Sequence, residues 1–279
     1  MTEATQLDLL LRKLIDAETF LFVPGDRPER VAKALVSDAD VVVVDLEDAV
    51  ADDRKDAARN GCQETLRGRG EIPVVIRVND PLAAAGSQDL HMVAELGDVA
   101  VMVPKAEGVR VAEARDRLLD TPVLPLVESA RGLVDVNALA DTAGVVRLCF
   151  GPLDLAAELG VEPTVDRLAP ARFAVVMASA AAGLPAPVDG PSTVIDDPAV
   201  VEREARAALE QGFRAKLCVH PAQLAATRAG LAPSAGDVEW ARSVLDAAGE
   251  DGLGRWRGGM VDRPVVDRAR QILARLRPS

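Results

Sequence analysis

The stretch Val41–Val50, VVVVDLEDAV, decides how this chain folds. Four consecutive valines lack the alternation of apolar and polar residues typical of a strand with one exposed face. They predict a strand that is buried on both faces of a parallel sheet. Asp45, Glu47 and Asp48 follow directly. Ligands bind at the carboxyl ends of strands in parallel α/β folds, so these acids predict a site for a metal or for acid–base chemistry. The alternative is that they cap the next helix.

The same pattern repeats on both sides of this stretch. Apolar, β-branched runs alternate with helical patterns, and polar residues follow most of the runs. The expected strands begin, in chain order, at Thr19, Val41, Pro73, Val99, Pro122, Val146, Leu184 and Phe213. Eight strands that alternate with helices predict an α/β fold of the TIM (β/α)8 barrel type over residues 1–232, rather than an open sheet.

The last part of the chain, residues 233–279, falls outside the barrel pattern. It predicts a helix over Pro233–Ala248, a glycine-rich link over Gly249–Asp262 and a basic terminal helix that ends at Leu276. A (β/α)8 barrel needs no further helices. We therefore expect this C-terminal helical extension to pack on a barrel mouth or on a neighbouring subunit.

The composition excludes several classes of function. The chain has 279 residues, of which 49% are hydrophobic, and its net charge of −12 argues against a nucleic-acid surface. Three cysteines stand far apart without CxxC spacing, which fits a reducing compartment. No apolar run approaches the roughly 20 residues of a membrane span, and the first residues lack a signal-peptide pattern. We expect a cytoplasmic protein with no nucleic-acid or membrane partner.

Two carboxylates form the candidate metal site. Glu128 and Asp154 lie at the ends of neighbouring expected strands, the fifth at Pro122–Ser129 and the sixth at Val146–Asp154. Such a pair with water suits Mg²⁺, a hard cation that takes a few carboxylate oxygens and keeps its waters. The sequence has no HxH, HExxH or Cys–His spacing, which argues against zinc or iron. The alternative for either residue alone is a helix cap or an ion pair.

Basic residues also follow the strands. Arg77 suits bidentate capture of a substrate carboxylate, or it pairs with Glu47 or Asp45, and one role does not exclude the other. Lys105 is a less specific candidate that neutralises these acids.

A second basic group follows the first expected strand. Arg27, Arg30 and Lys33 come directly after Pro24, in PGDRPER and the helix that it opens. They predict either a site for the phosphates of a large anionic ligand or a solvated helix face, and their spacing slightly favours the solvated face.

Nine motifs in fixed order cover essentially the whole chain. They are LFVPGDRPERVAKAL, VVVVDLEDAV, VIRVN, PKAE, LVESARGL, FGPLDLAAELG, PVDGP, FRAKLCVHPAQ and GGMVDRPVVDRA. In this order they resemble the citrate lyase β-subunit-like (CitE-like) branch of the HpcH/HpaI aldolase family, which includes malyl-CoA, citramalyl-CoA and citryl-CoA lyases. The resemblance implies a Mg²⁺-dependent carbon–carbon lyase. Such an enzyme cleaves a 3-hydroxyacyl-CoA into an acyl-CoA and a keto acid, or forms it by a Claisen-type condensation.

The resemblance also implies roles for individual residues. It implies Mg²⁺ on Glu128 and Asp154 and the substrate carboxylate on Arg77. It implies a homotrimer or hexamer in which Asp262 reaches a neighbouring subunit's mouth and transfers a proton at the enolate carbon. Coenzyme A is implied along the loop after the first strand, at Pro24, Arg27, Arg30 and Lys33. Behind the metal the resemblance implies a supporting group of Asp45, Glu47, Asp48 and Lys105, with Glu47 also counted among the catalytic residues.

One departure from the family pattern leaves the substrate open. Gly151 and Pro152 are expected to contact the substrate carbonyl, yet Pro152 lacks a backbone N–H. A Gly-Pro pair there resembles the pyruvate aldolases of the family, although those carry a histidine where this chain has DLED. Three alternatives therefore remain: a CoA-independent class II aldolase of 2-keto acids, a malyl-CoA-type thioesterase, and a citrate lyase β subunit that works with an acyl-carrier partner.

Overall fold

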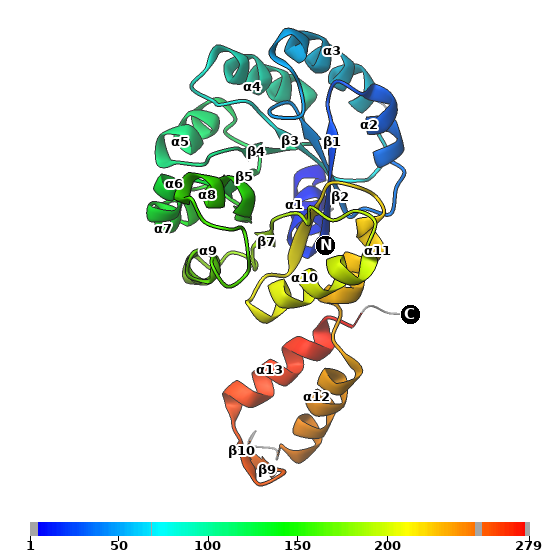
Figure 1. Ribbon diagram of the computed structural model, residues 1–279, viewed down its shortest axis with the longest axis vertical. Coiled ribbons are helices and arrows are strands. Elements are labelled where there is room, and N and C mark those ends of the chain that lie inside the picture. The colour runs from blue at the N-terminus through cyan, green and yellow to red at the C-terminus, as the bar shows by residue number, and fades with distance from the viewer. Residues whose placement is uncertain (1–4, 68, 249–252, 277–279) are drawn as a thin grey trace. The chain divides into compact units, whose positions relative to one another are not determined.

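A computed structural model of the chain describes residues 5–67, 69–248 and 253–276. Within these residues, eight parallel strands pair in chain order into a closed barrel, and helices surround it (Figure 1). The strands are β1 (Thr19–Pro24), β2 (Val41–Asp45), β3 (Val74–Arg77), β4 (Ala100–Val103), β5 (Val123–Val127), β6 (Cys149–Phe150), β7 (Val188–Asp189) and β8 (Ala215–Cys218). The predicted (β/α)8 barrel is confirmed.

The valine run of β2 belongs to two hydrophobic cores at once. Val41 and Val43 point into the barrel interior, whereas Val42 and Val44 pack outward against the helices. All four side chains are fully buried. Burying one valine stabilises the fold by about 1.5–3 kcal/mol, so both faces of this strand contribute. This two-sided burial is the physical reason for the missing alternation in the sequence.

The register of β2 and β3 sets up the functional end of the barrel. Asp45 lies directly beside Arg77 in the ladder, and both residues end their strands. The two side chains therefore lie next to each other at the carboxyl end of the barrel. An arginine and a carboxylate at such neighbouring positions are a favourable cross-strand pair.

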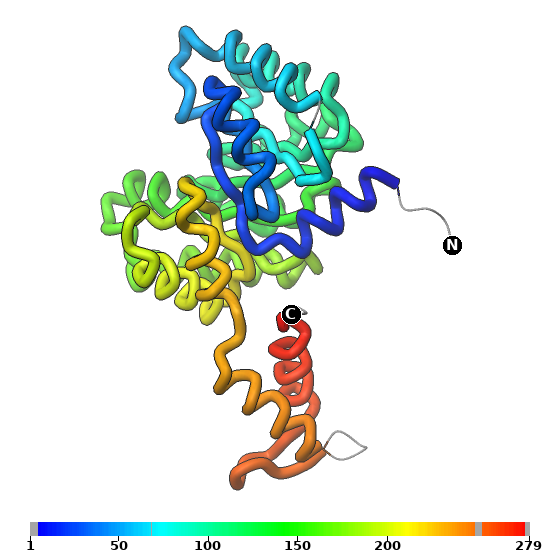
Figure 2. Tube along the Cα trace, turned by 90° about the vertical axis from the view of Figure 1, so that its right-hand side faces the viewer, coloured from blue at the N-terminus to red at the C-terminus, as the bar shows by residue number. Residues whose placement is uncertain are grey.

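Helices α1 to α11 belong to the barrel unit. Helix α1 covers the amino-terminal end of the barrel, lying behind the strands in Figure 1 and beside them in Figure 2. Leu10 and Leu14 of α1 pack with Phe20 into the interior core. The others are α2 (Pro28–Ala34), α3 (Lys55–Leu66), α4 (Ala84–Leu96), α5 (Gly108–Arg117), α6 (Ala130–Val134), α7 (Val136–Ala140), α8 (Pro152–Leu159), α9 (Ala169–Ala181), α10 (Pro198–Glu210) and α11 (Gln223–Leu231), with α1 itself at Gln6–Asp16 and a 3₁₀ turn, η1, at Asp52–Arg54.

The structure corrects the sixth strand. The expected strand over Val146–Asp154 contains β6 only at Cys149–Phe150, and the chain then enters helix α8 at Pro152. Proline fits the first helical position because its missing N–H would have no partner there. Asp154 therefore lies in the first turn of α8 and not at the end of a strand. Two further expectations were incomplete: the helix expected over Arg131–Ala140 is divided into α6 and α7, and α11 was not foreseen.

The chain forms two compact units, and the second unit begins at Leu231. It contains α12 (Ala235–Ala247), a hairpin of β9 (Gly254–Trp256) and β10 (Gly259–Val261), and α13 (Arg263–Ala274). Its helices pack on a small core of their own. The hairpin replaces part of the expected glycine-rich link, whose residues 249–252 lie outside the described residues. In the described part of the chain, no helix combines the length and the hydrophobicity that crossing a membrane requires.

Candidate active site

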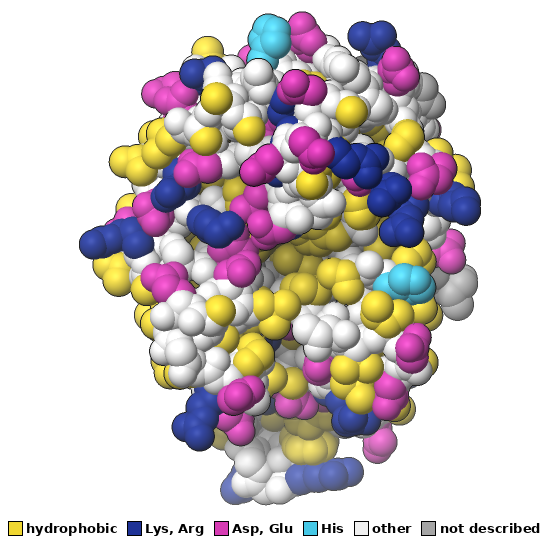
Figure 3. Space-filling model, turned by 45° about the horizontal axis from the view of Figure 1, so that its top comes forward, with side chains coloured by type: hydrophobic (Ala, Val, Ile, Leu, Met, Phe, Trp, Pro, Cys, Tyr) yellow, Lys and Arg dark blue, Asp and Glu magenta, His cyan; other side chains and the backbone are white. Residues whose placement is uncertain are grey.

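A cavity of about 480 Å³ opens at the carboxyl ends of the strands. The face shown in Figure 3 is hollowed at its centre, where hydrophobic side chains are visible and acidic side chains lie along one side. The cavity is lined by Phe22, Val23, Pro24, Asp45, Asp48, Ala49, Arg77, Leu126, Glu128, Gly151, Pro152, Leu153, Asp154, Pro191, Leu217 and Val219. The lining therefore has two parts: a charged group, which includes Asp45, Asp48, Arg77, Glu128 and Asp154, and an apolar wall, which includes Phe22, Leu126 and Leu217.

Arg77 is the centre of the charged group, since it contacts Asp45, Glu47 and Asp48. Its Nε and Nη2 donate to the two carboxylate oxygens of Asp45 at 2.7 and 2.6 Å, a bidentate pair. The oxygens of Asp45 also accept from the backbone N–H groups of Glu47 and Ala49, at 2.9 and 3.0 Å. The guanidinium carbon lies 5.0 Å from the ring centre of Phe22. Asp45 thus holds one edge of the Arg77 guanidinium and Phe22 covers one of its faces, so that the cation has a fixed position.

Glu47 bridges two basic residues. One oxygen lies 3.1 Å from Nη1 of Arg77 and the other accepts from Nζ of Lys105 at 2.6 Å. Burial raises the pKa of Glu47, although Arg77 and Lys105 oppose that rise. The turn that carries Glu47 is fixed in its own right, because Nζ of Lys55 donates to the carbonyls of Leu46 and Glu47 at 2.9 and 2.8 Å.

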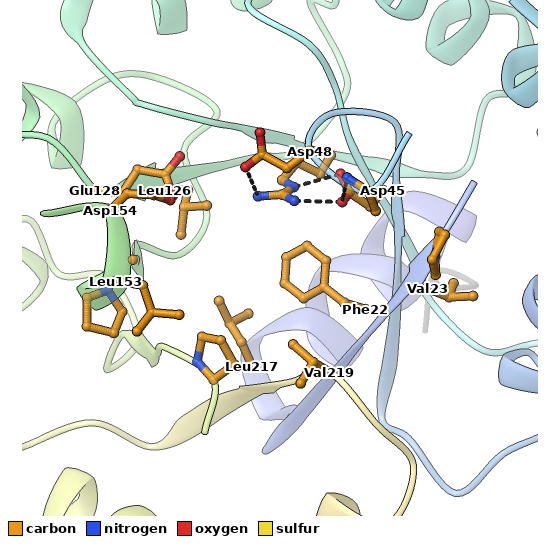
Figure 4. A pocket seen from close by; sticks show the side chains of 16 residues that line it. Phe22, Val23, Asp45, Asp48, Leu126, Glu128, Leu153, Asp154, Leu217 and Val219 are labelled. Carbon is orange, nitrogen blue, oxygen red and sulfur yellow. Dashed lines mark hydrogen bonds and ion pairs between the residues drawn. The ribbon is translucent and has the colours of Figure 1, made fainter. Parts of the chain in front are cut away.

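Glu128 carries a strongly perturbed carboxyl group. Its side chain is buried, and Oε1 accepts from the backbone N–H of Lys105 at 2.7 Å. Burial raises the pKa of Glu128 to about 8, and the charges of Glu47 and Asp154 add to the rise. Figure 4 shows Glu128 and Asp154 on the same side of the cavity. A carboxyl group with neighbouring acids and a raised pKa is what a cation would stabilise in its charged form.

The donor set fits a divalent cation that needs few protein ligands. Within the described residues, no three or more His, Cys, Asp or Glu side chains are grouped as a metal centre. An ion at Glu128 and Asp154 would therefore complete its coordination with water and substrate oxygens. Mg²⁺ binds in this manner, usually through one or two carboxylates.

The model of the HpcH/HpaI aldolase/citrate lyase family matches residues 18–221. The chain belongs to this family. The resemblance found in the sequence is thereby confirmed.

Individual relatives cover nearly the whole chain. A citrate lyase subunit beta-like protein of Mycobacterium tuberculosis is 37% identical over 265 residues, which are 92% of this chain and 94% of that protein. A (3S)-malyl-CoA thioesterase of Cereibacter sphaeroides is 31% identical, over 91% of this chain and 93% of its own. The crystal structure of CitE from M. tuberculosis in complex with magnesium, acetoacetate and coenzyme A has a TM-score of 0.82 and 36% identity, and the match covers 94% of this chain and 98% of that one.

The structure brings together most of the residues singled out in the sequence. Arg77, Glu128 and Asp154 line one cavity with Asp45 and Asp48, and Pro24, Gly151 and Pro152 line it as well. Glu47 and Lys105 are connected to this group through the contacts described above.

The basic residues after β1 lie on the outside of the barrel unit. Arg27 is the residue before α2, and Arg30 and Lys33 lie on that helix, all three exposed. Nε of Arg27 lies 3.6 Å from Asp26, whose other oxygen pairs with Arg54 at 2.9 Å. Sequence reasoning missed Arg54, although its position just after DLEDAVADD indicates a residue at the same end of the barrel.

Asp262 belongs to the second unit. It is the N-cap of α13, and its carboxylate accepts from the backbone N–H of Val265 at 3.3 Å.

Sequence reasoning also missed the apolar wall of the cavity. Phe22, Leu126 and Leu217 line it from β1, β5 and β8. Each of them lies in the second half of its strand and points into the barrel interior. The strict side-chain alternation along a strand was the available signal, because it assigns the inward face once the barrel is recognised.

Proposed function

We propose that this chain is a Mg²⁺-dependent carbon–carbon lyase. It would cleave a 3-hydroxyacyl-CoA such as malyl-, citramalyl- or citryl-CoA into an acyl-CoA and a keto acid, or form it by a Claisen-type condensation. The observation that carries this proposal is that the carboxylates of Glu128 and Asp154 and the fixed guanidinium of Arg77 line the same cavity at the mouth of the barrel. The relatives support it, since one 28% identical protein of Mus musculus is a citramalyl-CoA lyase.

Glu128 and Asp154 would hold the metal. Mg²⁺, when bound there, supplies a Lewis acid that polarises a carbonyl or hydroxyl oxygen of the substrate. Burial raises the pKa of Glu128 without the metal, and the charges of Glu47 and Asp154 add to that rise.

Mg²⁺ binding is expected to strengthen as the pH rises towards 8. Below a pKa of about 8, Glu128 carries a proton in the metal-free protein, and that proton must leave when the metal binds. The affinity should fall by up to about tenfold for each pH unit below 8 and level off above it. Isothermal titration in buffers of different ionisation enthalpy would count the released proton. A pH-independent affinity with no proton release would contradict the assignment of Glu128.

The chain's own residues orient the substrate and stabilise its charge. Arg77 keeps one edge for Asp45, so a substrate carboxylate would approach Nη1, which it would share with Glu47. Burial raises the pKa of Glu47, and the hydrogen bond from Lys105 opposes that rise and holds the carboxyl group close to Arg77. The apolar wall opposite excludes water from the acyl carbon, which protects an enolate from premature protonation.

The exposed Arg27, Arg30 and Lys33 would receive the phosphates of coenzyme A. Guanidinium groups suit phosphate because they donate two parallel hydrogen bonds, and an ammonium group adds a point charge. The thioester end would then extend past Pro24 into the cavity, which Pro24 lines.

Asp262 would act as the acid or base at the enolate carbon of a neighbouring copy, in a homotrimer or hexamer. We expect Asp262→Asn to lower the exchange of the acyl-CoA α-proton by about 100-fold or more, the usual scale for a lost general acid–base. Asparagine caps helices as well as aspartate does, so α13 should stay intact. Deuterium uptake from heavy water into acetyl-CoA or propionyl-CoA measures the exchange.

The matched control is Asp267→Asn. Asp267 is a half-buried residue of the same helix that pairs with Arg263 and Arg270. Equal exchange in Asp262→Asn, Asp267→Asn and the wild type would remove Asp262 from the mechanism.

Product analysis tests the proposed reaction itself. The protein would be incubated with Mg²⁺ and, in turn, malyl-, citramalyl-, citryl- and 3-hydroxy-3-methylglutaryl-CoA, and the keto acid and the acyl-CoA would be quantified. Equal amounts of both support the lyase. Free CoA with an intact hydroxy acid would instead identify a thioesterase, the activity for which the 31% identical relative is named. Turnover of a free hydroxy keto acid without CoA would identify a class II aldolase, and turnover only of acyl-carrier thioesters would identify a citrate lyase β subunit.

A further inference from the structure

A cluster of three charged side chains is buried beside the candidate active site. Arg172 of α9, Asp189 at the end of β7 and Lys216 of β8 have side chains that are only 5%, 4% and 4% exposed. Nη1 of Arg172 lies 2.6 Å from Oδ1 of Asp189, and Nζ of Lys216 donates to Oδ2 at 2.9 Å. The proposed reaction gives none of these residues a role.

The cluster is firmly held. Although burial alone would raise the pKa of Asp189, the charges of Lys216 and Arg172 keep it below its ordinary value, so the carboxylate stays charged. The guanidinium of Arg172 also lies over two rings, 5.6 Å from the centre of Phe150 and 4.6 Å from that of Phe213. Removing charges from water in this manner is costly, and in many proteins it adds little stability. Such a cluster therefore suggests a role beyond stability.

Lys216 connects the cluster to the start of α8. Its Nζ donates a second hydrogen bond, 2.7 Å long, to the carbonyl of Gly190. A side chain at Gly190 would collide with the ring of Pro152, because an added Cβ atom would lie 2.0 Å from its Cδ. Gly190 is thus in direct contact with the first residue of α8, and Lys216 fixes where that contact lies.

The start of α8 is in contact with or close to both candidate metal ligands, Asp154 and Glu128. Asp154 lies in the first turn of α8, two residues after Pro152. The residue before the helix, Gly151, is pressed against Glu128: an added Cβ atom there would lie 2.5 Å from Cβ and 2.7 Å from Oε2 of Glu128. A shift of this helix start would therefore change the separation of the two carboxyl groups.

The side of the helix start that faces the buried cluster is not fully packed. A second cavity, of about 340 Å³, lies against Pro152 and is lined by Arg172, Asp189 and Lys216. This leaves room for α8 to move on that side if the contact with Gly190 were lost. The hydrogen bond from Lys216 to Gly190 is then one restraint on the position of Pro152, beside the 2.9 Å backbone hydrogen bond that Gly151 donates to the carbonyl of Val127.

We infer that Lys216, Asp189 and Arg172 are positioning residues for the metal site: through Gly190 and Pro152 they fix the start of α8 and hence the distance between Asp154 and Glu128. This inference rests on the proposed Mg²⁺ site at these two carboxylates. It gives the buried cluster the role that outer hydrogen-bond partners of metal ligands commonly have, for which substitution costs about 10–100-fold in metal affinity.

A double-mutant cycle on Gly190 and Pro152 tests the inference. Mg²⁺ affinity is measured by isothermal titration, and thermal stability is measured separately in EDTA. Gly190→Ala should weaken Mg²⁺ binding by about 10–100-fold. Adding Pro152→Ala removes the ring that the new methyl group meets and should restore part of the lost affinity relative to Pro152→Ala alone, since the carbonyl oxygen of Phe150 still lies 3.0 Å from the added atom. The matched control is Gly61→Ala, because Gly61 has open space around it on α3.

Lys216→Met is the second variant, and it carries the test if Gly190→Ala does not fold. Asp189 stays paired with Arg172 in this variant, so the buried charges remain balanced, whereas the bond to Gly190 is lost. We expect Mg²⁺ binding to be about tenfold weaker or worse. Folded Lys216→Met that binds Mg²⁺ as tightly as the wild type, or a Gly190→Ala loss that Pro152→Ala does not relieve, would overturn the inference. A wild type that binds no Mg²⁺ would overturn the metal site itself, and the inference with it.

Discussion

The Arg77→Met variant is expected to lose about 3–5 kcal/mol of unfolding free energy, the usual effect of removing one partner from a buried ion pair. Asp45 and Glu47 are 2% and 9% exposed, and both lose a charged partner in this substitution. Methionine fills much of the same space, so the loss would come from uncompensated charge rather than from a cavity. Urea denaturation measures it as a lower midpoint with an unchanged slope.

The control for this experiment is Arg117→Met. Arg117 also forms an arginine–glutamate pair, 2.6 Å from Glu113, but its side chain is 46% exposed. Exposed pairs contribute about 0–1 kcal/mol, so this variant should remain close to the wild type. If both variants lose the same free energy, Arg77 is not the fixed centre of the cavity described above.

The Glu128→Gln and Asp154→Asn variants are expected to lose Mg²⁺ binding and about 1,000-fold or more in turnover. A bound metal contributes several kcal/mol to stabilising the charged transition state, and about 4 kcal/mol corresponds to three powers of ten. Titration calorimetry measures the binding, and the keto acid assay measures the turnover. Glu162→Gln is the matched control, since Glu162 is exposed.

The stability of the Glu128→Gln variant without metal shows whether Glu128 serves catalysis or only supports the fold. The pKa of Glu128 is about 8 in the folded protein, which is above its pKa in the unfolded chain. The carboxyl group therefore stabilises the fold fully at a pH below its unfolded pKa, and this stabilisation is lost as the pH rises through 8. Glutamine avoids that loss and can still accept from the N–H of Lys105. The variant should therefore be at least as stable as the wild type above pH 8, while it is inactive. A destabilised variant with intact Mg²⁺ binding would mean that Glu128 is structural.

Much of the fold was predictable because it depends on local signals. The two-sided burial of Val41–Val44 appears directly as an unbroken valine run, and alternation with helical segments then gives the closed barrel. Arg77 was predicted to pair with Glu47 or Asp45, or to capture a substrate carboxylate, and the structure places it in contact with both acids. The position of Asp154 was predicted incorrectly, since a strand was extended through Pro152, where the chain starts a helix.

The rest of the site depends on residues that are distant in sequence. Lys105 meets Glu47 across 58 positions, and the sequence did not indicate which of Asp45, Glu47 and Asp48 it would contact. The cluster of Arg172, Asp189 and Lys216 forms only when one helix and two strands converge, and no local pattern marks such a convergence. Contacts of this kind follow from the three-dimensional fold, because the linear pattern does not determine which charged side chains meet.

The most direct test of this account is the position of a bound metal. Mn²⁺ takes the same oxygen ligands as Mg²⁺ and scatters anomalously, so crystals of the protein soaked in Mn²⁺ would reveal its site. We predict a single strong anomalous peak between the carboxylates of Glu128 and Asp154, on the side of the cavity that faces Arg77. A peak at another site, or no peak between these two carboxylates at millimolar Mn²⁺, would contradict the account.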